Sequence, residues 1–107
     1  MSEGTAKTIE AMAPQDKIAE FCRRWEIVEF ALFGSAVRDD FGPESDVDVL
    51  VTFTPEAPWS LFELVQMQQE LEVIFNRKVD LIEEAALKNP FRRRAILREK
   101  EVIYAAQ

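Results

Sequence analysis

Hydrophobic residues first recur at the spacing of a helix. The positions that set this period are Ile18, Phe21, Cys22 and Trp25. Because they lie three or four residues apart, they share one helical face, and Pro14 is placed to begin the helix. The apolar run over 27–33 has the length of a buried strand and ends at Gly34. The pattern predicts a helix followed by a strand, with Cys22 as a small core residue.

The segment from Asp46 to Phe53 alternates strictly between two kinds of position, which is typical of a strand. One face would hold Val47, Val49, Val51 and Phe53, and the other Asp46, Asp48, Leu50 and Thr52. Residues at i and i+2 of a strand point from the same face, with their Cα atoms about 6.5–7 Å apart. The alternation therefore predicts that the carboxylates of Asp46 and Asp48 project side by side. A loop over 39–45 precedes this strand.

Further elements follow a proline-containing linker. Ser60 and Glu63 stand at the positions of a capping box, which predicts a helix from Ser60 to about residue 75. Much of its apolar stripe would come from Leu61, Leu64, Val65, Leu71 and Ile74. We then expect a strand over 78–82, a helix over 90–98, and either a short strand or a docking tail over 102–104.

This order of elements predicts a mixed α/β layer fold (α+β), in which a small mixed β-sheet is flanked by helices. The chain of 107 residues is long enough for one domain with a real core. We expect that domain to span 14–107. Residues 1–13 carry no clear hydrophobic period, and we expect them to form a flexible tail.

Composition narrows the chemistry. The chain has no histidine and one cysteine, which excludes Ser-His-Asp and Cys-His catalysis, zinc sites built on histidine or several cysteines, and an internal disulfide. Carboxylates, hydroxyls, Lys, Arg and hard cations such as magnesium remain. The formal net charge of −7 disfavours general binding to nucleic acids. Neither a signal-peptide pattern nor an apolar run near the roughly 20 residues of a membrane span is present, so we expect a cytoplasmic location.

Asp46 and Asp48 are the first candidates for chemistry. Two carboxylates on one strand face can converge on a pair of metal ions about 3.5–4 Å apart. Without a cation between them they would repel each other. Asp80, flanked by apolar residues in the strand predicted over 78–82, could complete the metal site and act as a general base toward an acceptor hydroxyl.

Gly34 and Ser35 are the candidates for binding phosphate. They follow a predicted strand and open a helical turn over 35–38. A glycine lets the backbone approach a ligand closely, free amides at a helix start favour an anion, and the serine adds a hydroxyl. Taken singly, a Gly-Ser turn or an Asp-x-Asp pair is common in surface structure. The combination in this order and spacing is what favours catalysis.

The arrangement Gly34-Ser35, ten residues, Asp46-x-Asp48 and a later Asp80 resembles the DNA polymerase β-like nucleotidyltransferase superfamily. The size and layout, from about Pro14 to Tyr104, resemble its minimal nucleotidyltransferases, or MNT domains. Two departures concern nucleotide contacts. Relatives often carry a larger residue at the position of Ala36 and a glycine at that of Asp39.

The resemblance implies a nucleotidyltransferase fold and a division of roles. Gly34 and Ser35 would hold the β- and γ-phosphates of ATP, and Asp46, Asp48 and Asp80 would bind two magnesium ions. AMP would pass to a hydroxyl as pyrophosphate leaves. Members of the MNT family resemble antitoxins that pair with a helical HEPN toxin, which is a ribonuclease. The resemblance therefore implies that a toxin tyrosine is the acceptor of AMP and that the two proteins form a hetero-oligomer.

Several alternatives stay open on sequence grounds. Arg38 is a candidate for nucleotide or phosphate contact, or it forms an ion pair with a neighbouring acid. The basic run over 92–94 is either a solvated helix segment or a contact for phosphate or an acidic partner. Trp59 and Phe62 either pack at the core or form an exposed docking patch. The functional rivals are an antitoxin that neutralises its partner by binding alone and a nucleotidyltransferase acting on a small molecule.

Overall fold

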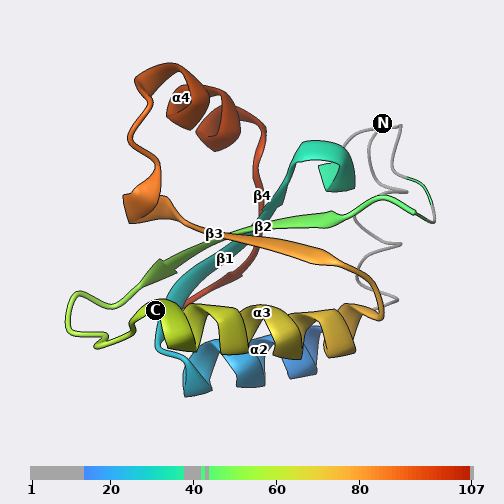
Figure 1. Cartoon of the computed structure of the whole chain (residues 1–107), viewed down its shortest axis with the longest axis vertical. Helices are drawn as coiled ribbons and strands as arrows, with labels where there is room; N and C mark the ends of the chain where they lie inside the picture. The colour runs from blue at the N-terminus through green and yellow to red at the C-terminus, as the bar shows by residue number, and fades with distance from the viewer. Residues whose placement is uncertain (1–13, 38–41, 43, 107) are drawn as a thin grey trace.

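A computed structural model describes residues 14–37, 42 and 44–106. In this part of the chain, a four-stranded sheet in the order β3-β2-β1-β4 lies between two layers of helices (Figure 1). The strands are β1 (Ile27–Phe33), β2 (Val47–Phe53), β3 (Val79–Glu83) and β4 (Glu101–Ala105). Helices α2 (Gln15–Arg24) and α3 (Leu61–Phe75) cover one face, and α4 (Pro90–Glu99) stands over the other. Two short 3-10 helices, η1 (Gly34–Val37) and η2 (Glu84–Ala86), follow β1 and β3. The mixed α/β fold is confirmed.

The sheet is mixed because its strands pair in two senses. β1 runs antiparallel to both β2 and β4, whereas β2 and β3 are parallel. Parallel neighbours need a crossover connection, and α3 supplies it between β2 and β3. The segment predicted as either a strand or a docking tail, 102–104, is part of edge strand β4. No helix among the described residues is both long and apolar enough to span a bilayer.

The alternation of β2 is confirmed by what each face contacts. Val47, Val49 and Val51 are buried against α2 and α3, in a cluster that also holds the predicted face of α2. Leu50 packs on the opposite side, in a second cluster with Ile96 of α4. Cys22 belongs to the first cluster, and burial raises the pKa of its thiol to about 12. It is the small core residue that the helical period predicted.

Helix α3 begins as predicted, but its buried stripe lies elsewhere on the helix. The backbone N–H of Ser60 donates to Glu63 Oε1 at 2.7 Å, as a capping box requires. The buried residues are Met67, Leu71 and Phe75, with Leu64 and Ile74 partly buried beside them. Leu61 and Val65 were predicted in this stripe and are 74% and 50% exposed. At 3.6 residues per turn they lie roughly 80° and 120° around the axis from Leu71, so they point to solvent.

Small boundary shifts matter where they touch the candidate site. β2 begins at Val47, one residue later than predicted, so Asp46 precedes the strand. Arg77 Nη1 holds the preceding turn by donating to the carbonyl oxygens of Gly42 and Ser45 at 2.9 and 3.0 Å. β3 and α4 each end one residue beyond the predicted boundary, and η2 was not predicted.

Glu84 of η2 connects α4 to the sheet. Its Oε1 accepts a hydrogen bond from the Thr52 hydroxyl at 2.7 Å, and its Oε2 lies 2.8 Å from Arg93 Nη2. Arg93 Nη1 also donates to the Glu84 carbonyl oxygen at 3.2 Å. The Thr52 hydrogen bond, followed by the Arg93 contacts, holds the pKa of Glu84 below its usual range, against the effect of burial. The ionised carboxylate therefore stabilises the docked position of α4.

Replacing Glu84 by Gln is expected to lower the free energy of unfolding by about 0.5–1 kcal/mol near pH 7, because an ion pair this close to solvent is screened. The pKa of Glu84 is lower in the folded state, so its contribution is complete above the unfolded pKa of about 4.3 and disappears as the pH falls through the folded value. Urea unfolding at pH 7 and at pH 3 measures this. A deficit of the same size at both pH values would contradict it.

Candidate functional site

The turn after β1 has a backbone conformation that favours glycine. Gly34 has a φ of +65°, which side-chain-bearing residues rarely adopt. A Cβ on Gly34 would lie 2.2 Å from Asp48 Oδ2, so a side chain here would collide with that carboxylate. The sequence predicted that the backbone at Gly34 would approach a ligand closely; in the structure, the carboxylate of Asp48 lies against it.

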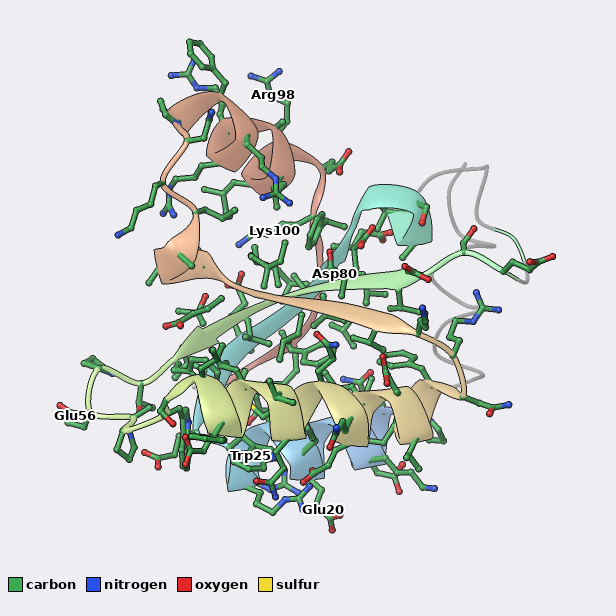
Figure 2. The ribbon with its side chains drawn as sticks, viewed as in Figure 1. Glu20, Trp25, Glu56, Asp80, Arg98 and Lys100 are labelled. Atoms are coloured by element: carbon green, nitrogen blue, oxygen red, sulfur yellow. The ribbon has the colours of Figure 1, made fainter. Side chains whose placement is uncertain are left out.

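Asp48 and Asp80 lie in one row across neighbouring strands. Asp48 pairs with Phe33 on β1 and with Asp80 on β3. Because β2 and β3 are parallel and in register, the two aspartates belong to the same face of the sheet, the one that α4 overhangs. Figure 2 shows Asp80 on β3 below α4. The structure thus brings Gly34, Asp48 and Asp80, which are far apart in the sequence, together at one end of strands β1, β2 and β3.

An open cavity of about 440 Å³ lies between this row and α4. Its lining residues are Phe33, Gly34, Ser35, Asp48, Asp80, Arg92, Ala95, Ile96 and Glu99. Asp46 is exposed and is not among them. It lies next to the cavity, because the Ser35 hydroxyl donates to the Asp46 carbonyl oxygen at 3.3 Å. Of the predicted site residues, Gly34, Ser35, Asp48 and Asp80 share the cavity, Asp46 borders it, and Arg38 is outside the described residues.

Sequence reasoning missed the wall that α4 provides. The four lining residues of α4 are Arg92, Ala95, Ile96 and Glu99. Their spacing of three, four and seven residues is that of one helical face, and this period was the available signal. The most direct contact is the backbone N–H of Gly34, which donates to Glu99 Oε1 at 3.0 Å. Glu99 is therefore part of the site.

The predicted basic run separates into different roles. Arg92 faces the cavity, Arg93 bridges to Glu84, and Arg94 lies on the exposed side of α4. Arg98 also lies on the outer side of α4, away from the sheet (Figure 2). Of the basic residues over 92–94, Arg92 alone lines this cavity.

The aromatic pair also separates. The Trp59 indole N–H donates to the Trp25 carbonyl oxygen at 2.7 Å, and the two rings are 5.1 Å apart between centroids. Trp59 therefore has the packing role, whereas Phe62 is 86% exposed.

The donor set of the cavity fits a hard cation. Asp48 and Asp80 offer carboxylate oxygens, which magnesium prefers, and the missing side chain of Gly34 leaves the space next to Asp48 Oδ2 open. Among the described residues, no three acidic or cysteine side chains are grouped closely enough to hold a metal ion. Asp46, Asp48 and Asp80 do not form such a group in this arrangement, so a metal site here would need their side chains to adjust.

Comparisons with known proteins identify the family of this chain. The model of the nucleotidyltransferase domain family matches residues 16–103. The protein adenylyltransferase MntA of Thermococcus cleftensis is 33% identical over 100 residues, which cover 94% of this chain and 95% of that protein.

Two solved structures share the fold at lower identity. One is a chain of a toxin–antitoxin complex with AMP-PNP, with a TM-score of 0.71 and 18% identity, covering 88% of this chain and 75% of that one. The other belongs to a tri-AMPylated Shewanella oneidensis HEPN toxin in complex with its MNT antitoxin, with a TM-score of 0.61 and 17% identity, covering 87% and 71%.

Proposed function

Because this chain belongs to the nucleotidyltransferase domain family, we propose that it is a protein adenylyltransferase that moves AMP from ATP to a tyrosine hydroxyl of a HEPN-type toxin and so acts as its antitoxin. The observation that carries the proposal is the strand register that brings the Gly34 amide, Asp48 and Asp80 to one cavity. A relative named as a protein adenylyltransferase covers nearly the whole chain, which supports a protein acceptor. The nucleotide and toxin complexes of structures with the same fold support ATP as donor and the toxin as partner.

The phosphates would be held at the turn after β1. The backbone of Gly34 can approach them closely because the residue has no side chain, and the Ser35 hydroxyl is a further donor beside it. Arg92 of α4 adds a positive charge to the same cavity. Arg38 remains a proposed nucleotide contact on sequence grounds. These groups would hold the triphosphate at this end of the strands.

The carboxylates would hold metal and move a proton. Two magnesium ions on Asp46, Asp48 and Asp80 would supply charge neutralisation on the triphosphate and activation of the acceptor hydroxyl. Asp80 is exposed, so an acceptor arriving from solvent can reach it. We assign it the proton of the tyrosine hydroxyl, which is lost as the phenolic oxygen attacks the α-phosphate.

The acceptor belongs to another protein in this proposal. The described cavity is open, and its polar lining includes the groups assigned to the nucleotide and the metal, so a partner would bring its tyrosine to the open side. The net charge of −7 suits a toxin with a basic RNA-binding surface, because opposite charges speed encounter. We place the pair in the cytoplasm, where ATP is available.

The test is mass spectrometry of the toxin encoded beside this chain, after incubation with the chain, ATP and magnesium. We expect a mass gain of one or more AMP groups on a toxin tyrosine. Asp80→Asn should slow this transfer by about 100-fold or more while largely sparing ATP affinity, because the acceptor of the tyrosine proton is lost while Asp46 and Asp48 would still bind magnesium. Glu83→Gln, which removes a charge from the same strand outside the cavity, is the matched control.

An unmodified toxin that is bound and inhibited would instead favour neutralisation by binding alone. A toxin that is neither bound nor modified would favour a small-molecule acceptor.

A further inference from the structure

Glu99 accepts a hydrogen bond from the Gly34 backbone N–H, the group that would bind the triphosphate in the proposed function. Its Oε1 accepts from the Gly34 backbone N–H at 3.0 Å, across 65 positions of sequence. A carboxylate and a phosphate oxygen are both anionic acceptors, so they compete for one donor. Asp48 Oδ2 lies against the same glycine. Two carboxylates therefore meet at the point where a polyanion would bind.

Helix α4 holds Glu99 in place. Ile96, one turn earlier, is buried against the sheet, and Arg93 is tied to Glu84. The next residue, Lys100, forms an ion pair with Glu29 of β1. The backbone at Glu99 is thus anchored on both sides, and the side chain must rotate away to release the amide.

Helix stability does not explain a glutamate at this position. Glu99 is the last residue of α4, where the helix dipole disfavours a negative charge. Its carboxylate makes a favourable contact outside the helix, with the Gly34 amide. The placement therefore indicates a role at the cavity.

We propose that Glu99 is an internal competitor of the triphosphate, which sets nucleotide affinity and makes it depend on a divalent cation. The inference rests on the proposed function, because it takes the Gly34 amide as a phosphate donor. An incoming triphosphate must displace the Glu99 carboxylate and overcome its negative charge. A cation bound with the nucleotide offsets part of that repulsion.

The experiment compares Glu99→Gln with the parent protein by titration calorimetry of ATP, once in EDTA and once in magnesium. Glutamine keeps the length of the side chain and an acceptor oxygen but removes the charge. We expect ATP affinity in EDTA to rise about tenfold in Glu99→Gln, with a smaller gain in magnesium. Glu101→Gln, two residues away on β4 and outside the cavity lining, removes the same charge and should change affinity by less than about twofold.

A second variant, Glu99→Ala, removes both the charge and the acceptor and should raise affinity in EDTA at least as much. In amide NMR spectra without nucleotide, Glu99→Ala should move the Gly34 signal and Glu101→Gln should leave it in place. Unchanged or weaker ATP binding in both Glu99 variants, while the parent binds ATP with magnesium, would overturn the competitor role alone. Failure of every protein to bind ATP with magnesium would overturn the proposed function as well.

Discussion

Asp48→Asn is expected to abolish nucleotidyl transfer, with a loss of at least about 1,000-fold in rate. Asp48 is half-buried at the centre of the row, with its carboxylate against Gly34 and its strand partner Asp80 beside it. Asparagine has nearly the same shape as aspartate, so the packing of the fold is kept. It lacks the charge that binds a hard cation, so stabilisation of the transferring phosphate is lost. The measurement is the rate of AMP incorporation into the partner toxin at saturating magnesium.

The fold should tolerate this change. In the metal-free protein, the Asp48 and Glu99 carboxylates both lie next to Gly34, so Asp48→Asn lowers the negative charge at this turn. We expect the free energy of unfolding of Asp48→Asn without metal to equal or exceed that of the parent. Asp46→Asn should also abolish transfer, whereas Asp16→Asn, on α2 beyond the opposite face of the sheet, should leave it intact. Full activity of Asp48→Asn at ordinary magnesium would rule out the assignment.

The face of the candidate site was predictable because it depends on local periodicity. Strict alternation over 46–53 correctly separated Asp48 from the valines that pack on α2 and α3. The capping box at Ser60 correctly placed the start of α3. Both signals come from residues within a few positions of each other, where backbone geometry fixes the outcome.

The rest depends on contacts between distant segments. The parallel register that aligns Asp48 with Asp80 follows from how α3 crosses over the sheet, which no local period encodes. The hydrogen bond from the Gly34 backbone N–H to Glu99 depends on how α4 packs above the sheet. Leu61 and Val65 were wrongly predicted to be buried for a related reason. The helical period shows which residues share an apolar arc, but not which part of that arc packs against the sheet. The sequence therefore predicted the candidate carboxylates on the strands and the helix over 90–98, but not that this helix lies above them.

Gly34→Val is expected to eliminate detectable ATP binding, and transfer with it. The positive φ of 65° is strained for a β-branched residue, and the first atom of the new side chain would fall 2.2 Å from Asp48 Oδ2. Either the turn or the Asp48 carboxylate must move, and both belong to the proposed triphosphate site. Titration calorimetry with ATP and magnesium measures the loss, and circular dichroism checks that the sheet and helices persist.

Ser35→Ala separates loss of a contact from loss of the turn. It removes one hydroxyl, whose hydrogen bond to the Asp46 carbonyl oxygen is 3.3 Å long, and leaves the backbone path unchanged. The expected cost in ATP binding is about 1–3 kcal/mol, which is roughly 5- to 150-fold in affinity and well short of the effect at Gly34. A side chain at position 34 would disturb both the turn and the Asp48 carboxylate. A folded Gly34→Val protein with parental ATP affinity would therefore mean that the phosphates bind away from this turn. Such a result would remove the shared reason for assigning Gly34, Ser35 and Asp48 to one site.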